Sequence, residues 1–110
     1  MEKQMIETQA TISRWAVQTF GTAQPSNMST AVRANQEMSE LLRDLAENDK
    51  SAHAIQEAAD VVILLFVLAS RMGYSLMAEV DRKMAINRSR EWTVDATGHG
   101  YHVEKVASHG

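Results

Sequence analysis

Apolar positions recur every three to four residues along most of the chain, a spacing that predicts helices rather than strands. We expect four helices, over residues 5–20, 27–47, 51–72 and 75–92. The clearest apolar stripe lies in the second, at Ala31, Ala34, Met38, Leu41, Leu42 and Leu45. Pro25 follows the first helix and Gly73 the third, and both residue types end helices. Asn27 or Ser29 would cap the second helix.

The third helix has an unusual composition, because residues 58–69 are apolar except for Asp60. This block is shorter than the ~20 residues that a membrane span needs, so we expect no membrane partner. A helix that is apolar all round must be buried on more than one side. In so short a chain the second side is expected to meet another subunit, which predicts a homo-oligomer with this helix at the interface.

Length and charge narrow the classes of protein further. We expect one domain over residues 1–110, with residues 93–110 as a C-terminal tail that forms a small hairpin or stays extended. The absence of cysteine excludes disulfides and thiolate metal sites, and the net charge of −3 argues against a nucleic-acid polymer as partner. Residues 1–5 lead into a polar amphipathic segment rather than a signal peptide, so we expect a cytoplasmic protein.

Two acidic pairs carry the candidate chemistry, Glu37/Glu40 and Glu57/Asp60, each with a spacing that puts both carboxylates on one helix face. The polar residues 47–51 between them predict a tight turn. If the helices fold back antiparallel, residue 37 comes level with about 60, and 40 with about 57. Four converging carboxylates would repel one another without cations, and oxygen ligands suit Mg²⁺ or Mn²⁺. Glu37 and Glu40 alone fit a solvated face, but Asp60 in an apolar block favours a metal site.

Candidate substrate contacts lie outside these pairs. Lys83, Asn87 and Arg90 follow one helical stripe and offer two cations and an amide to phosphate oxygens, although each alone fits a solvated face. Trp15 is most simply a core residue, and stacking on a nucleotide base is the alternative.

These motifs together resemble the MazG-like all-α NTP pyrophosphatase superfamily. The resemblance rests on Glu37-Met-Ser-Glu40, on Glu57-Ala-Ala-Asp60 and on the stripe of Lys83, Asn87 and Arg90. Within the superfamily, residues 33–42, 83–92 and 101–104 are similar to the dATP/dGTP pyrophosphohydrolase branch, which is often found in phages and bacteria. A phage-encoded member would act in the host cytoplasm.

The resemblance implies a four-helix MazG-like bundle that assembles as a homodimer or homotetramer. It implies Mg²⁺-dependent cleavage of a purine dNTP, dGTP or dATP, between the α and β phosphates, giving dNMP and pyrophosphate. Metal ions would neutralise the triphosphate and activate water. The expected ligands are Glu37, Glu40, Glu57 and Asp60. Of these, Glu37 or Glu40 would also orient the water or accept its proton. The expected substrate contacts are Lys83, Asn87 and Arg90 for the β and γ phosphates, and Asn35 and Trp15 for base or sugar.

Two alternatives stay open at this point. The chain could be a pyrophosphatase for another nucleotide such as dUTP. It could also be a non-catalytic helical oligomerisation module whose acidic residues only solvate a groove. A di-iron bundle is disfavoured, because the Glu-x-x-His pairs of that class are absent.

Overall fold

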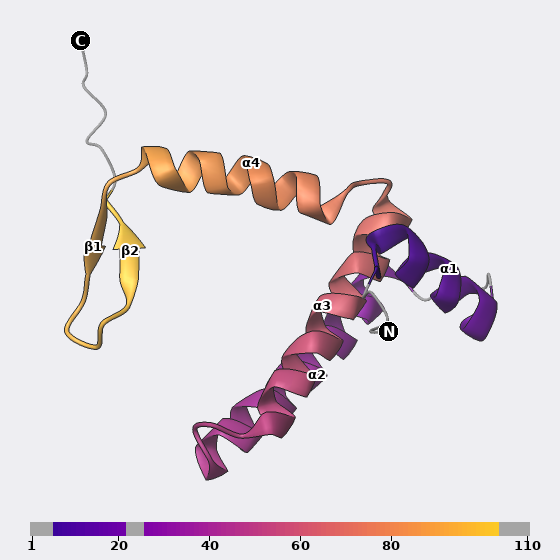
Figure 1. The fold of residues 1–110 in the computed structure, drawn as a ribbon, viewed down its shortest axis with the longest axis horizontal. Coiled ribbons are helices and arrows are strands. Elements are labelled where there is room, and N and C mark those ends of the chain that lie inside the picture. The colour runs from indigo at the N-terminus through magenta and orange to yellow at the C-terminus, as the bar shows by residue number, and fades with distance from the viewer. Residues whose placement is uncertain (1–5, 22–25, 104–110) are drawn as a thin grey trace, which may run out of the picture. The chain divides into compact units, whose positions relative to one another are not determined.

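The computed structural model describes residues 6–21 and 26–103, and most of them are helical (Figure 1). The elements are α1 (Gln9–Phe20), α2 (Asn27–Glu47), α3 (Ala52–Met72), α4 (Leu76–Ser89), β1 (Trp92–Val94) and β2 (Gly100–His102). All four predicted helices are present. The mostly helical fold agrees with the all-α prediction, and β1 and β2 pair as a small antiparallel hairpin, one of the two forms expected for the tail. The chain divides into two units, Met1–Leu76 and Met77–Gly110.

Polar caps set where the first three helices begin. Thr8 forms a reciprocal capping box with Thr11, so α1 starts later than the predicted residue 5, which itself lies outside the described residues. The side chain of Ser26 accepts from the backbone N–H of Ser29 and caps α2, one residue before Asn27 and three before Ser29, the two predicted caps. Ser51 caps α3 in the same way, which leaves the predicted boundaries of α2 and α3 correct to within one residue.

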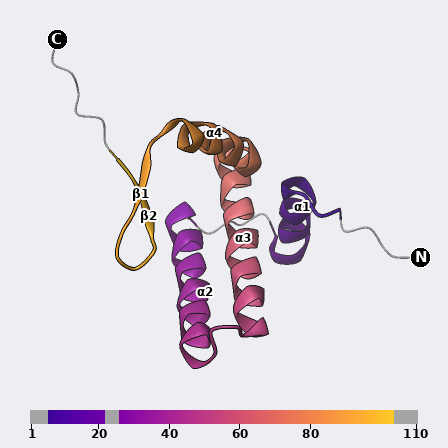
Figure 2. The same cartoon turned by 60° about the vertical axis from the view of Figure 1, so that its left-hand side comes forward.

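The α2–α3 helical hairpin is the main packed feature of the N-terminal unit, and the two helices lie side by side in both ribbon views (Figures 1 and 2). The turn between them is held locally: the backbone N–H of Ser51 donates to the carbonyl of Asn48, and the side chain of Asn48 accepts from the N–H of Lys50. Two small residues of this helical hairpin are buried, Ala34 on α2 and Ala54 on α3. The predicted antiparallel fold-back is therefore confirmed.

Helix α1 packs against α3, and one side chain fixes its start. The amide nitrogen of Gln9 donates to the carbonyl of Tyr74 at 2.7 Å and to the hydroxyl of Ser70 at 3.2 Å. Its amide oxygen accepts from the N–H of Leu76 at 2.9 Å. Gly73, with φ of 80°, adopts the left-handed conformation that ends α3 and turns the chain back toward Gln9. The amide of Gln9 thus ties α1 to the end of α3.

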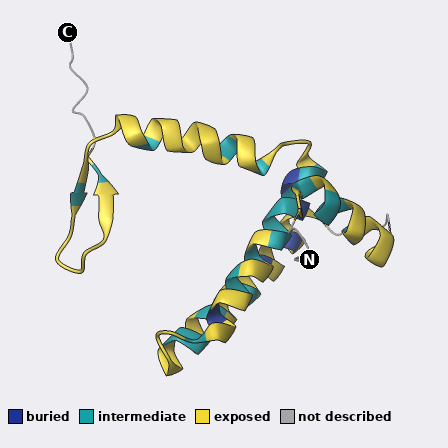
Figure 3. Cartoon of the chain, viewed as in Figure 1, coloured by how far each residue is buried: buried dark blue, intermediate teal, exposed yellow. Residues whose placement is uncertain are grey.

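Few side chains are buried within the described part of the chain (Figure 3). Among residues 6–21 and 26–103 the buried apolar residues are Ala34, Ala54, Val67 and Ala69, and no large side chain there is fully buried. On α3, Ile55 is 70% exposed and Val62 45% exposed. Part of the surface that the sequence predicted to be covered is thus open in the single chain.

Length alone does not separate α3 from a membrane span. The helix has 21 residues, and an 18-residue window within it has a mean hydropathy of 1.7, enough by length and composition to cross a bilayer, although core helices of soluble proteins share these properties. The prediction that it is too short considered only residues 58–69. Helix α3 also carries Glu57 and Asp60, and carboxylates are costly in the hydrocarbon region. Its composition therefore favours burial against protein.

In the C-terminal unit, α4 ends earlier than predicted. Trp92 was expected in the helix but begins β1, and its indole N–H donates to the carbonyl of Asn87 at 2.7 Å. The loop between the strands is organised by Asp95, whose carboxylate accepts from the backbone and hydroxyl of Thr97 and from the N–H of His99. The hydrogen bonds from Thr97, followed by those from the backbone, lower the pKa of Asp95. No residue of α4 is buried.

Candidate metal and nucleotide site

The acidic cluster, defined as Glu37, Glu40 and Glu57, forms where α2 and α3 face each other. One carboxylate oxygen from each residue lies within 4.8 Å of those of the other two. Glu37 and Glu40 share a face because they are one helical turn apart on α2, and the antiparallel fold-back brings Glu57 of α3 to them. Glu37 and Glu57 are half-buried, whereas Glu40 is exposed. The predicted convergence of these three carboxylates is present in the structure.

The carboxyl groups of the acidic cluster shift one another's pKa values. The pKa of Glu57 is raised to about 7, first by the interaction of its carboxyl with that of Glu37, and then by desolvation and by the nearby Glu40. The same interaction with Glu57 lowers the pKa of Glu37. Carboxylates this close together repel one another, so the cluster favours the binding of a proton or of a cation.

One oxygen atom of the acidic cluster indicates that the cluster suits a divalent cation. Oε2 of Glu57 is shielded from solvent and has no hydrogen-bond partner among the described residues. A shielded carboxylate oxygen without a partner is costly. A cation placed among the three residues would satisfy it, and an all-oxygen donor set suits hard ions such as Mg²⁺ and Mn²⁺. The residues present therefore fit a divalent metal site.

Asp60 behaves differently from the other predicted ligands. It does not belong to the acidic cluster, and it is exposed rather than enclosed in the apolar block. The sequence predicts that the apolar block around Asp60 is buried, but in the single chain the apolar residues of α3 are only partly covered and Asp60 is exposed. Asp60 nevertheless lines the same pocket as Glu37, so its role as a metal ligand stays a prediction.

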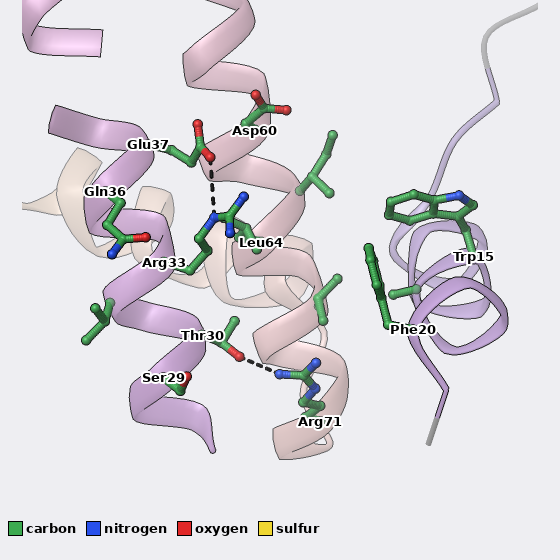
Figure 4. A pocket seen from close by; sticks show the side chains of 14 residues that line it. Trp15, Phe20, Ser29, Thr30, Arg33, Gln36, Glu37, Asp60, Leu64 and Arg71 are labelled. Carbon is green, nitrogen blue, oxygen red and sulfur yellow. Dashed lines mark hydrogen bonds and ion pairs between the residues drawn. The ribbon is translucent and has the colours of Figure 1, made fainter. Parts of the chain in front are cut away.

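A pocket of about 710 Å³ opens beside the cluster, between α1, α2 and α3. Glu37 and Asp60 lie at one end, and Thr30 and Arg71 at the other (Figure 4). Apolar residues of α3 and the rings of Trp15 and Phe20, which meet edge-to-face at 5.5 Å, line part of it. The pocket therefore combines carboxylates at one end with an aromatic and apolar wall.

Two arginines of the pocket were not predicted as site residues. Arg33 forms an ion pair with Glu37, with 3.5 Å between Nε and Oε1. Arg71 donates to the hydroxyl of the buried Thr30 and has no ion pair among the described residues. The spacing of four residues between Arg33 and Glu37 was a usable signal in the sequence, since such pairs face each other on a helix. No comparable spacing in the sequence relates Arg71 to another residue of the pocket.

The two predicted base contacts have different outcomes. Trp15 lines the pocket and is 51% exposed, so in the single chain it is not the core residue of the simpler interpretation. Asn35 is not among the lining residues, and its neighbour Gln36 is. On a helix that presents residues 33 and 37 to the pocket, residue 36 is angularly closer to that face than residue 35.

The predicted phosphate contacts belong to the C-terminal unit. Lys83 and Asn87 share a face of α4, with Lys83 exposed and Asn87 half-buried. Arg90 follows the helix rather than continuing it, so the expected helical stripe of three residues is wrong at its last member. The backbone N–H of Arg90 donates to the carbonyl of Asn87. The phosphate-binding role of the three residues stays a prediction.

Fold and site define a mostly helical domain in which a helical hairpin presents a carboxylate cluster suited to divalent metal ions. The chain matches the MazG-like family over residues 34–104, a range that holds both acidic pairs. The chain belongs to the MazG-like family. No curated protein sequence matches it significantly.

A solved structure adds a more specific likeness. The chain is 28% identical to a cyanophage S-2L MazG-like pyrophosphohydrolase, with a TM-score of 0.69, over 89% of this chain and 91% of that chain. That protein is bound to dGDP and to three catalytic Mn²⁺ ions per active site. The family assignment predicted from the two acidic motifs together with Lys83, Asn87 and Arg90 is confirmed.

Proposed function

We propose that this protein is an Mg²⁺-dependent pyrophosphohydrolase that cleaves a purine deoxynucleoside triphosphate, dGTP or dATP, to the monophosphate and pyrophosphate. The observation that carries the proposal is the acidic cluster, with its unpartnered Oε2 of Glu57, beside a pocket with an aromatic wall. Family membership supports the reaction class. The likeness to a pyrophosphohydrolase bound to dGDP supports a purine deoxynucleotide as substrate.

In this proposal the carboxylates hold the metal and position the water. Glu37, Glu40 and Glu57 form one ligand set, and Asp60 contributes from the same end of the pocket. Bound divalent ions neutralise the triphosphate and make an attacking water more acidic. Glu37 or Glu40 orients that water toward the α-phosphorus or accepts its proton. Mn²⁺ is expected to substitute for Mg²⁺, since both prefer oxygen ligands.

The remaining contacts hold the substrate. Trp15 offers a ring face or edge to the base at the pocket wall, and its 51% exposure leaves that surface open to a ligand. We assign the β and γ phosphates to Lys83, Asn87 and Arg90, whose cationic and amide groups stabilise the pyrophosphate as it leaves. Asn35 remains a weaker candidate for the sugar or base.

We also propose a homo-oligomer, a dimer or tetramer, in which α3 contributes to the interface. Ile55, Ala59 and Val62 recur at helical spacing on α3 and are exposed in the single chain. Val62→Lys should shift the protein to a smaller species in sedimentation equilibrium, because a charge in an apolar interface is costly. Lys50→Glu, a charge change in the turn after α2, is the matched control. If Val62→Lys leaves the mass unchanged, this face is not the interface.

The reaction is tested by incubating the protein with each common dNTP and NTP and Mg²⁺ in water enriched in ¹⁸O. Monophosphate and pyrophosphate should form in equal amounts, fastest with dGTP or dATP, with no turnover in EDTA. Attack at the α-phosphorus places the ¹⁸O in the monophosphate. Fastest turnover of dUTP would move the assignment to the other nucleotide class. Absence of turnover with every nucleotide, with Mg²⁺ or Mn²⁺, would leave the helical interaction module as the better account.

A further inference from the structure

Arg33 occupies an unusual place, because it pairs with a carboxylate that the proposed function needs for metal. It lies one helical turn before Glu37 on α2 and lines the same pocket (Figure 4). Its side chain is 64% exposed, whereas that of Glu37 is 14% exposed. An ion pair at 3.5 Å with so exposed a guanidinium is weak, because water screens the attraction between the two charges. Arg33 can therefore leave Glu37 at little cost.

The charge balance of the cluster changes when Glu37 becomes a metal ligand. Three carboxylates converge there, and Arg33 is the one basic side chain that forms an ion pair with any of them among the described residues. A divalent cation at the cluster would take over the neutralisation of Glu37, which weakens the attraction between Glu37 and Arg33. Arg33 would then be a mobile, mostly exposed guanidinium in a pocket next to bound metal.

A guanidinium in that position suits a phosphate group. Its planar set of N–H donors matches two phosphate oxygens at once, and such charge-assisted hydrogen bonds are stronger than neutral ones. The side chain lies between the carboxylate end of the pocket and the end that holds Thr30 and Arg71 (Figure 4). A nucleotide that reaches from the cluster into the pocket would pass Arg33.

We propose that Arg33 exchanges partners: it neutralises Glu37 in the metal-free chain and binds a phosphate of the nucleotide once Glu37 is a metal ligand. This inference rests on the proposed function, since it requires both metal and nucleotide at the cluster. The competing role is a fixed one, in which Arg33 stays on Glu37 and holds that carboxylate in the orientation that the metal needs. The two roles predict opposite effects on metal affinity.

The test uses Arg33→Gln, with Arg43→Gln as the matched control. Arg43 is an exposed arginine of the same helix and does not line the pocket, so both variants lose the same charge from α2. Calorimetry measures the binding of Mn²⁺ alone, and then of the non-hydrolysable α,β-imido analogue of dGTP in saturating Mn²⁺. Circular dichroism verifies that each variant keeps the helical content of the unaltered protein, and Arg33→Lys replaces Arg33→Gln if it does not.

Partner exchange predicts that Arg33→Gln binds Mn²⁺ as tightly as Arg43→Gln or more tightly, but binds the analogue roughly ten- to a hundredfold more weakly. Arg33→Lys should recover part of that loss. Weaker Mn²⁺ binding by Arg33→Gln, with no further loss for the analogue, would overturn the inference in favour of the fixed role. Equal behaviour of the Arg33 and Arg43 variants would also overturn it. If the unaltered protein binds neither Mn²⁺ nor the analogue, the proposed function itself fails.

Discussion

The α2–α3 hairpin contributes carboxylates to the proposed site, whereas the C-terminal unit contributes cationic and amide side chains. The two regions also differ in how far their residues are buried. The hairpin is held by buried alanines and a hydrogen-bonded turn, and it brings three carboxylates to within 4.8 Å of one another. In the C-terminal unit, α4 has no buried residue, and the described ion pair there is Arg82 with Glu79 at its surface. Carboxylates of one cluster need a cation to neutralise them, whereas the cationic and amide groups of the C-terminal unit suit a polyphosphate. We therefore expect changes in the α2–α3 hairpin to alter metal binding, and changes in the C-terminal unit to alter the handling of substrate without altering metal binding.

The largest effect should come from removing a ligand of the hairpin. Glu37→Gln is expected to lower kcat by at least about a hundredfold, because the amide oxygen is a poor substitute for a carboxylate on a divalent ion. Initial rates of pyrophosphate release measure this loss. Glu47→Gln, an exposed glutamate at the end of the same helix, should keep normal rates. Equal rates for the two variants would remove Glu37 from the site.

Asp60→Asn separates two roles within the hairpin. If Asp60 is a ligand, most activity should be lost with the helical fold intact. Because Asp60 lies outside the acidic cluster, the binding of the tightest Mn²⁺ ion should change much less than in Glu37→Gln. Kinetics and Mn²⁺ titration of the same preparation give both values, with Asp49→Asn in the exposed turn as the control. Near-full turnover would take Asp60 out of the mechanism.

Charge removal in the C-terminal unit should act on substrate alone. Lys83→Gln and Arg90→Gln are each expected to lower kcat/KM roughly tenfold, the magnitude of one lost charge-assisted hydrogen bond to the phosphates of the substrate and of the leaving pyrophosphate. The stabilisation by Mg²⁺ without nucleotide should stay unchanged, and Arg88→Gln should resemble the unaltered protein in both measurements. A loss of Mg²⁺ stabilisation in the Lys83 variant would contradict the division of roles between the two regions.

The smallest expected effect is a pH dependence of stability in EDTA. Because the pKa of Glu57 is raised from 4.5 to about 7 in the folded chain, the folded state holds that proton more tightly than the unfolded state. This contribution to stability is complete below pH 4.5 and is lost as the pH rises through about 7. The lowered pKa of Glu37 acts below this window. Thermal melts from pH 5 to 8 should therefore show a falling Tm.

Two controls assign that pH effect to the cluster. Glu57→Gln should flatten the profile, since the amide does not titrate. Mg²⁺ should stabilise the protein more at pH 8 than at pH 5, because protons and the metal compete for the same carboxylates. A Tm that rises from pH 5 to 8 in EDTA, with no response to Glu57→Gln, would show that the cluster does not hold the proton.

The hairpin was the more predictable of the two regions. Helical spacing fixed the shared face of Glu37 and Glu40, and the polar turn fixed where α3 folds back, so the approach of Glu57 followed. The sequence could not show that Asp60 stays outside the cluster, because a residue's angle toward a neighbouring helix depends on how the two helices pack. The four-residue spacing of Arg33 and Glu37 is typical of an ion pair on a helix, but the acidic motif pointed to Glu37 only as a metal ligand.

The C-terminal unit was less predictable because its boundaries depend on local hydrogen bonds. The spacing of Lys83, Asn87 and Arg90 continued a helical pattern, yet α4 ends at Ser89. The indole of Trp92 binds the carbonyl of Asn87, and the chain then turns into the hairpin. The sequence predicts either a β-hairpin or an extended tail for these residues, because strands of three residues are too short to give a clear alternating pattern.

The central claim is that the carboxylates of the α2–α3 hairpin bind the divalent ions on which activity depends. Calorimetric titration of Mn²⁺ into the unaltered protein and into Glu57→Gln, both without nucleotide, tests it most directly. The account predicts saturable binding by the unaltered protein and an affinity at least about tenfold lower in the variant. Equal binding by the two proteins, or no binding by either, would contradict it.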